Sequence, residues 1–338
     1  MTDIAAIVQS LGGMAQKQQL VRRGARDLDL TLAVRLGEVM RARLGWYTVL
    51  PASDARVRAV RVGGRLTGIS AIIAMGGWVL GEHPLHVSVA ENAGRLRTQQ
   101  NRHRRIDVTA PAGVVLHWDQ QDVTERGDAM CVGLLDALHR VVCDEALEVA
   151  IAAVDWALHS GLIDEFDLEA IMLGVPRSRR IPTDWFDDAC DSLPESLART
   201  RLRLEGFAVR TQVLLQTGEP LDLVVEDSVA IEVDGREFHE NRFVRDRRKD
   251  IHATIERFHT LRPPAAMVFG EWPLLLSAVR VALAERSALP ALEDSGLSRT
   301  QRQKRARRPK ATPQLLNLRQ RNGAGAGIGR VRRALALG

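Results

Sequence analysis

The sequence of 338 residues predicts an α+β protein with a helical head, a mixed helical middle, a C-terminal sheet flanked by helices and a disordered tail. Three observations predict this class. Hydrophobic residues (45%) and charged residues (26%) occur at the levels of a globular protein. Apolar residues recur at helical spacing early in the chain and again in its middle. Later they form short runs separated by turn residues, which is typical of strands.

Charge is segregated along the chain. The formal net charge of +5 combines +9 over residues 1–106, −16 over residues 107–294 and +12 over residues 295–338. A basic head and a basic tail suit a polyanionic partner such as DNA, whereas an acidic middle repels one. The overall charge therefore says less about partners than the charge of each block.

Cysteine usage and hydropathy favour a cytoplasmic protein. The three cysteines, Cys131, Cys143 and Cys190, form no CxxC pair, which excludes a disulfide framework and a cysteine-rich zinc site. The longest nearly uncharged apolar stretch, Ile69–Gly81, is shorter than the about 20 residues of a membrane-spanning helix. The first residues lack the basic and apolar regions of a signal peptide. We therefore expect no membrane partner.

Residues 1–66 are predicted to form a winged helix-turn-helix domain. Short helices over residues 3–11 and 15–23 end at glycines, and Asp27 can cap a third helix. Apolar residues of the third helix repeat at i+4, namely Leu28, Leu32 and Leu36. Residues 39–50 then alternate as a hairpin does. In that architecture the third helix enters the DNA major groove and the hairpin, or wing, contacts phosphate.

Four arginines of the head are the candidate DNA-binding residues. Arg26 and Arg35 belong to the third helix, and Arg41 and Arg43 belong to the wing. Two alternatives stay open at this point. The arginines can form an ordinary solvated face, and the same architecture also serves for protein contacts alone.

Two short strings near the wing carry a resemblance to a known family. They are Gly45–Val49 (GWYTV) and Leu66–Ala71 (LTGISA). The head resembles the N-terminal winged-helix domain of AbiE-type antitoxin-like proteins, although Ile69 stands where that pattern commonly has a His or Arg. The resemblance implies a DNA-binding head, a nuclease-like domain later in the chain, and a toxin or other protein as partner.

Residues 67–180 are predicted to form an α/β scaffold. Residues 85–90 and 112–118 are expected to be strands, and residues 128–173 two or three helices. Six histidines are scattered without ligand spacing and are expected to be packed or surface residues: His83, His86, His103, His117, His139 and His159. Asp144, Glu145 and Glu148 are expected to form a solvated acidic face. The segment Pro176–Pro182 is the expected domain boundary.

Residues 184–287 carry the strongest chemical signal. A helix is expected from Ser192 to Gly206, followed by strands over Val209–Gln216, Leu221–Val225 and Val229–Gly235. Residues Glu226–Ser228 form the expected tight turn between the last two strands.

Carboxylates interrupt the last two apolar strands. Glu232 and Asp234 are two residues apart and therefore share one face, and a hairpin can bring Asp222 to that face. Three acids on one face repel one another unless a cation lies between them. Carboxylate oxygens are the ligands that Mg²⁺ prefers. Such a metal can activate water and offset the charge of a phosphodiester.

A longer set of residues resembles the PD-(D/E)xK nuclease superfamily, and within it the Vsr-like endonucleases of very-short-patch repair. The matching residues are Glu195, Asp222, Ile231–Gly235, Phe238–His239, Arg245–Asp250 and Leu261–Arg262. The resemblance implies a restriction-endonuclease fold, with a central mixed sheet flanked by helices. It also implies a metal-dependent DNA endonuclease in which Asp222 and Glu232 hold Mg²⁺ or Mn²⁺.

The chain departs from the superfamily pattern at its third position, where Asp234 replaces the usual lysine. The Vsr-like relatives also lack that lysine and use a histidine as base, which implies His239 as the general base here. Asp234 is expected to ligate the metal or orient water, and Glu195 to support the metal ligands. Arg245, Arg247 and Arg248 are expected to bind DNA phosphate.

Simpler roles stay open for these residues. Glu195 lies three residues after Ser192, as in a capping box. Asp222 can be a solubility residue of an edge strand, His239 a surface histidine, and Arg245–Lys249 a solvated helix face. At the level of the whole chain, the alternatives are an antitoxin-like DNA-binding regulator whose nuclease-like domain does not cut, and a protein-interaction module.

Residues 288–338 are predicted to be a disordered basic tail. Like charges repel along Arg302–Lys310, and Gly323–Gly327 offers nothing to bury, so neither segment offsets the cost of ordering its backbone. The tail is expected to remain solvated, to contact phosphate, or to fold onto the acidic middle.

Overall fold

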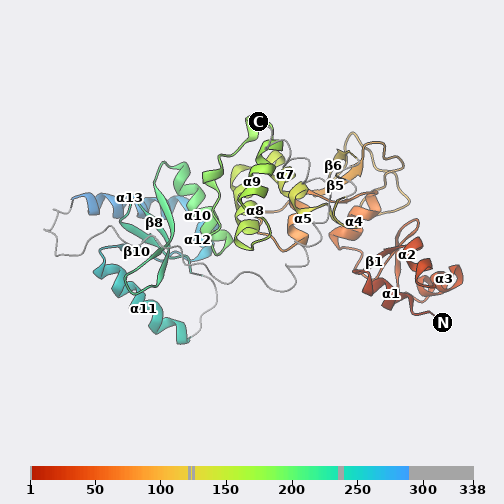
Figure 1. Ribbon diagram of the computed structural model, residues 1–338, viewed down its shortest axis with the longest axis horizontal. Coiled ribbons are helices and arrows are strands. Elements are labelled where there is room, and N and C mark those ends of the chain that lie inside the picture. Colours follow the sequence, from red (N-terminus) through yellow and green to blue (C-terminus); the bar gives the residue numbers. More distant parts are fainter. Residues whose placement is uncertain (1, 121–122, 124–125, 235–239, 289–338) are drawn as a thin grey trace. The chain divides into compact units, whose positions relative to one another are not determined.

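The computed structural model describes residues 2–120, 123, 126–234 and 240–288, and Figure 1 shows their mixture of helices and small sheets. This confirms the α+β class. The predicted tail, residues 289–338, lies outside the described residues. Within the described ranges, no helix combines the length and apolar character that crossing a bilayer requires.

The described chain divides into two units. Unit 1 contains the residues up to Ala146 together with Ile163–Ile181, and unit 2 contains Leu147–Leu162 and the residues from Pro182 onward. The division after Ile181 falls within the predicted boundary segment. Sequence analysis, however, placed residues 147–162 with the middle of the chain.

The first part of unit 1 contains three helices and a small antiparallel sheet in the order β1-β3-β2. Its elements are α1 (Ile4–Ser10), β1 (Met14–Gln16), α2 (Lys17–Arg22), α3 (Asp27–Arg35), β2 (Met40–Arg43) and β3 (Trp46–Thr48). Ile4, Leu20, Leu30 and Tyr47 pack in its core. The predicted helices and hairpin are present, but residues 14–16 form a strand because they pair with β3.

Two of the three leucines of the i+4 repeat face away from this core, whereas Leu32 is partly buried. Leu28 and Leu36 are 62% and 64% exposed, whereas Leu30 and Ala33 are buried. The buried pair is spaced i, i+3, which also defines one helix face. The i+4 leucine pattern therefore marked the solvent face of α3.

The remainder of unit 1 surrounds a second small sheet, β4-β5-β6. Its strands are β4 (Arg65–Leu66), β5 (Leu85–Ala90) and β6 (Val114–Asp119), and its helices are α4 (Ala55–Val62), α5 (Gly68–Ala74), α7 (Leu134–Asp144), α9 (Glu165–Gly174) and the short η1 (Arg177–Arg179). β5 and β6 are parallel, and β4 pairs antiparallel with β5. α5 packs against both β5 and α7.

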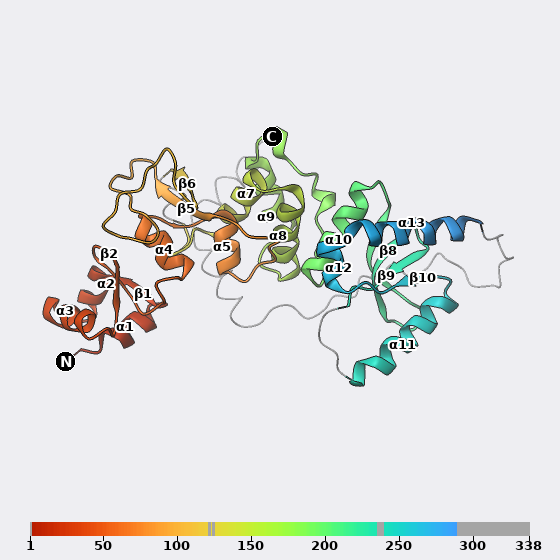
Figure 2. The same cartoon turned by 180° about the vertical axis from the view of Figure 1, so that it is seen from behind.

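Unit 2 is built on the four-stranded sheet β10-β9-β8-β7, in which β10 is parallel to β9 and the other pairs are antiparallel. Figure 2 shows helices on both sides of this sheet. The strands are β7 (Val209–Leu214), β8 (Pro220–Val225), β9 (Val229–Ile231) and β10 (His259–Leu261). The helices are α8 (Leu147–His159), η2 (Thr183–Trp185), α10 (Leu193–Leu204), α11 (Glu240–Ile255), α12 (Ala265–Gly270) and α13 (Trp272–Ala288).

Helix α8 joins unit 2 through a buried polar contact with α10. The carboxylate of Asp155 on α8 accepts a hydrogen bond from Ser196 Oγ (2.6 Å) and pairs with Arg199 (2.7 Å). Asp155 and Arg199 are 0% and 3% exposed. A buried charge requires a partner. Because the partner of Asp155 lies on α10, α8 packs with unit 2 rather than with the helices that precede it in sequence.

The β8–β9 hairpin has the register that positions the candidate site. Glu226 and Asp227 both have positive φ (47° and 53°), as in the two-residue turns that join tight hairpins. Leu223 pairs with Ile231, which puts Asp222 beside Glu232. β9 ends at Ile231, earlier than the predicted Gly235, and the chain continues to an isolated bridge with Pro264.

Candidate active site

Asp222 and Glu232 meet across the β8–β9 hairpin. The backbone N–H of Asp222 donates to Glu232 Oε1 (3.1 Å), and the backbone N–H of Val233 donates to Asp222 Oδ2 (3.1 Å). Glu232 is only 5% exposed. Each carboxylate therefore accepts a hydrogen bond from the opposite segment, which fixes the orientation of the pair.

The two carboxyl groups are electrostatically strained. Burial, together with repulsion from Glu232 and Glu195, raises the pKa of Asp222 to about 8. Burial also raises the pKa of Glu232, against the attraction of Lys249. A divalent cation would relieve this repulsion, and Mg²⁺ is commonly held by one or two carboxylates plus substrate phosphate. The oxygen donors of Asp222 and Glu232 fit such an ion.

Helix α11 supplies a cation that sequence analysis did not assign to the site. Lys249 Nζ forms an ion pair with Glu232 Oε2, and the lysine side chain is 14% exposed. From the sequence, the Arg245–Lys249 run was expected to be a solvated face or to contact phosphate and acids, with no separate role for Lys249. One signal was available in the sequence, because Lys249 is the only lysine between residues 18 and 303 of an arginine-rich chain.

Arg262 links the neighbouring acids. Its guanidinium lies 2.7 Å from Asp250, 3.3 Å from Asp234 and 3.9 Å from Glu232. Arg262 follows β10, and Asp250 lies on α11 one residue after Lys249. The ion pair with Asp250 therefore ties α11 to the end of β10, next to the Glu232 carboxylate.

Glu195 does not form the capping box that was one of its two predicted roles, because the side chain of the N-cap residue Ser192 makes no capping hydrogen bond. Instead, the Glu195 carboxylate accepts hydrogen bonds from Ser192 Oγ (2.7 Å) and from the backbone N–H of Asp191 (2.9 Å). Its charge also raises the pKa of Asp222. Glu195 thus lies in the first turn of α10 and contributes to the negative potential around Asp222.

The other predicted site residues of unit 2 are placed differently. The Asp234 side chain is 52% exposed and pairs with Arg262. Beyond Ile231 the backbone runs beside Pro263, since the N–H of Asp234 donates to the carbonyl oxygen of Pro263 at 3.1 Å. Arg247 pairs with Asp250 at 3.7 Å, and Arg248 is exposed. His239 and the side chain of Arg245 lie outside the described residues.

The candidate arginines of the head divide into two kinds. Arg35 is exposed, and Arg26 pairs with Asp29 at 3.1 Å while its own side chain stays 73% exposed. Arg41 donates to Tyr47 Oη (3.0 Å), and Arg43 donates to the carbonyl oxygens of Val62 (2.8 Å) and Arg61 (3.0 Å). The two wing arginines are therefore engaged within unit 1, because α4 ends against β2 and needs donors for its last carbonyls.

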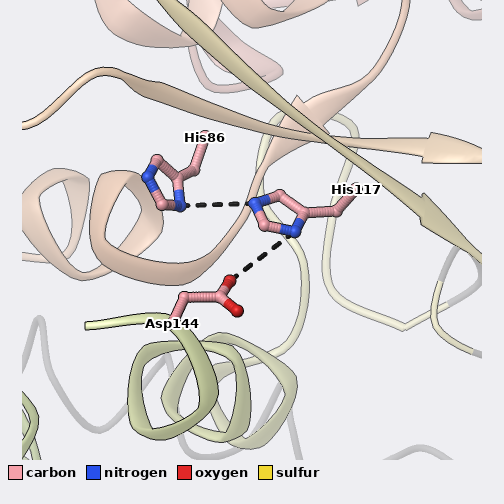
Figure 3. Close-up of side chains that lie close together, drawn as sticks. All are labelled: His86, His117 and Asp144. Atoms are coloured by element: carbon pink, nitrogen blue, oxygen red, sulfur yellow. Dashed lines mark hydrogen bonds and ion pairs between the residues drawn. The ribbon is translucent and has the colours of Figure 1, made fainter.

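Unit 1 contains a second cluster, of His86, His117 and Asp144, which Figure 3 shows pointing toward one another. Within the described residues, the ligand atoms of these three side chains all lie within 4.8 Å of one another, as a metal site requires. Sequence analysis expected isolated histidines and a solvated acidic face here. Parallel pairing of β5 and β6 brings the two histidines together, and Glu148 instead pairs with Arg201 of α10 at 2.8 Å.

No protein-family model matches this chain, and a search of curated proteins finds no match. The group of Asp222, Glu232 and Lys249 is therefore the feature of unit 2 that points most directly to a chemical function.

Proposed function

We propose that the protein is a metal-dependent endonuclease that hydrolyses phosphodiester bonds of DNA in unit 2. The observation that carries this proposal is the buried pair Asp222 and Glu232 with Lys249 ion-paired to Glu232. Two neighbouring buried carboxylates, one of them ion-paired with an ammonium group, combine a cation site with a fixed positive charge. That combination suits a reaction in which negative charge develops on a phosphate.

The roles of the residues follow from their contacts. When bound by Asp222 and Glu232, Mg²⁺ or Mn²⁺ would supply an activated water and offset phosphate charge. Lys249, held by Glu232, would stabilise the negative charge that develops on the phosphate oxygens. Arg262 is a positioning residue, since its ion pair with Asp250 holds α11 against the sheet. His239 keeps the role of general base that the Vsr-like resemblance implies.

The fold of unit 2 supports the proposal. Its mixed sheet is flanked by helices, and Asp222, Glu232 and Lys249 come from β8, the end of β9 and α11. The flanked mixed sheet and the two carboxylates are features that resemblance to the PD-(D/E)xK superfamily implies, whereas a lysine on α11 is not part of that pattern. In the head, the order helix, strand, helix, helix, hairpin supports a winged-helix reading in which exposed Arg26 and Arg35 contact DNA.

A plasmid-nicking assay tests the proposal. The full-length chain should nick supercoiled DNA in Mg²⁺ or Mn²⁺ and not in EDTA. Asp222→Asn should lower the rate at least about 100-fold, because it removes a metal ligand. Asp227→Asn is the matched control, since this exposed acid of the same hairpin pairs with Arg210 at the surface and should cleave like wild type. The endonuclease proposal would be overturned if none of the three proteins nicked DNA, or if all three nicked it at the same rate.

A second function, a DNA-binding regulator that does not cut, is favoured by one observation. Arg22, Arg23 and Arg35 are exposed on the helices of the head, independent of unit 2. Gel shifts in EDTA should then show DNA affinity that falls steeply with salt and is weakened by Arg35→Ala. Arg210→Ala, a surface arginine of unit 2, serves as the charge-matched control. Binding without cleavage would favour this regulator, with a toxin or other protein as its partner.

A further inference from the structure

One face of the β5–β6 pair is polar although it is buried. Ser88 lies opposite His117, and Ala90 lies opposite Asp119, in a parallel register. Because alternate residues share a face, His86, Ser88, His117 and Asp119 lie on the same side. All four polar residues are at most 8% exposed. Parallel strands normally bury apolar side chains, so this face requires an explanation.

The two imidazoles face each other at short range. His86 Nδ1 lies 3.3 Å from His117 Nε2, and His117 Nδ1 lies 3.7 Å from Asp144 Oδ2 at the end of α7. The backbone of Gly68 and the side chain of Arg140 lie beside His86 Nδ1, since a Cβ at Gly68 would lie 3.1 Å from Arg140 Cγ and 3.4 Å from His86 Nδ1. Figure 3 shows the three side chains converging from two strands and one helix.

The facing nitrogens of the two imidazoles lie closer together than any imidazole nitrogen of this pair lies to a carboxylate. His86 Nε2 lies 3.8 Å from Glu145, and His117 Nδ1 lies 3.7 Å from Asp144, so both separations are longer than a hydrogen bond. These two carboxylates therefore place negative charge beside the histidines, and a cation bound there would offset it.

The carboxylates around the cluster also favour a bound cation. Asp119 Oδ2 is buried and has no hydrogen-bond partner among the described residues, while its other oxygen pairs with Arg140 at 3.0 Å. His83 Nδ1 holds Glu145 in place at 3.2 Å. Carboxylates behind metal-bound imidazoles are the usual way in which proteins orient such ligands.

We propose that His86, His117 and Asp144 bind a transition-metal dication of the zinc class. Imidazole nitrogens suit Zn²⁺ and its neighbours, whereas Mg²⁺ and Ca²⁺ take oxygen ligands. Zinc–nitrogen bonds of about 2.0–2.1 Å in a tetrahedral site put two ligands about 3.3–3.4 Å apart, which matches the separation of the facing nitrogens. Asp144 supplies the third ligand, since an oxygen of it lies within 4.8 Å of a nitrogen of each histidine.

The metal would join β5, β6 and α7 within unit 1. It is independent of the Asp222 site, which lies in unit 2. Zinc binding should therefore raise the melting temperature of the full chain without any DNA present.

Equilibrium dialysis against Zn²⁺ after EDTA treatment, followed by metal analysis, tests the proposal on the full-length chain. Wild type should retain about one equivalent, and Co²⁺ in its place should give the visible absorption of a protein-bound ion. His117→Gln should weaken zinc binding at least about tenfold. His252→Gln, a histidine of α11, should bind like wild type.

Asp144→Asn keeps the test decisive if His117→Gln does not fold, because Asp144 is partly exposed and the change preserves its shape. Tenfold weaker binding by Asp144→Asn supports the site. Unchanged binding by Asp144→Asn, or no zinc retained by wild type, overturns it.

Discussion

At the scale of single residues, burial decides how much an ion pair matters to the stability of the fold. Asp155 pairs with Arg199 in a setting where both side chains are almost fully buried, whereas Asp227 pairs with Arg210 at 75% exposure. Removing one partner of a buried pair leaves an uncompensated charge, but removing one partner of an exposed pair leaves a solvated one.

Asp155→Asn should therefore lower the free energy of unfolding by about 3–5 kcal/mol. Asp227→Asn should change it by about 0–1 kcal/mol, because water screens that pair. Urea unfolding followed by circular dichroism measures both variants. Similar losses from the two substitutions would contradict the assignment of α8 to the core of unit 2.

The candidate site residues differ in how far the sequence could predict them. Asp222 and Glu232 follow from a hairpin whose turn and alternation are local, so their meeting was predictable. Lys249 could not be placed, since it depends on how α11 docks against the sheet. His86 and His117 are thirty-one residues apart on parallel strands. The register of a parallel pair is not fixed by a local turn, so the sequence pattern showed only scattered histidines.

Asp222 also predicts a pH dependence in the absence of metal. Its folded-state pKa of about 8 lies above the ordinary value of 3.8, so its contribution to stability is present at low pH and is lost as the pH rises toward about 8. Asp222→Asn cannot ionise. In EDTA, the variant should therefore gain stability relative to wild type between about pH 5 and about pH 8. If the difference between the unfolding free energies of the two proteins were constant over that range, the raised pKa of Asp222 would be contradicted.

At the scale of elements, helix α3 shows that an apolar repeat can predict a helix without predicting which of its faces is buried. The leucine repeat at i+4 correctly predicted a helix but marked its exposed face. The sheet β1-β3-β2 and α1 cover the side that carries Leu30 and Ala33, and only tertiary packing decides which of two apolar stripes is buried.

Leu30→Ala should destabilise the head by about 2–5 kcal/mol, since it leaves a cavity in the core. Leu28→Ala on the same helix should change stability by less than about 0.5 kcal/mol, because Leu28 is 62% exposed. Thermal unfolding of the two variants gives the comparison. A larger loss from Leu28→Ala would mean that the leucine repeat is the packing face after all.

At the scale of the whole molecule, the two proposed sites lie in separate units. The acidic block of residues 107–294 includes the proposed endonuclease site, so a bound metal, Lys249 and nearby arginines must offset repulsion of DNA. The head has the opposite charge and exposes Arg26 and Arg35. Net charge alone did not predict this division, because +5 is the sum of opposing blocks.

The central claim is that Asp222, Glu232 and Lys249 act together on a phosphodiester. The most direct measurement is the initial rate of plasmid cleavage by Lys249→Met at saturating DNA and Mg²⁺, beside wild type and Asp227→Asn. The account predicts a loss of about 100-fold or more for Lys249→Met, with DNA affinity close to that of wild type. An unchanged rate for Lys249→Met in an enzyme that cleaves would contradict it.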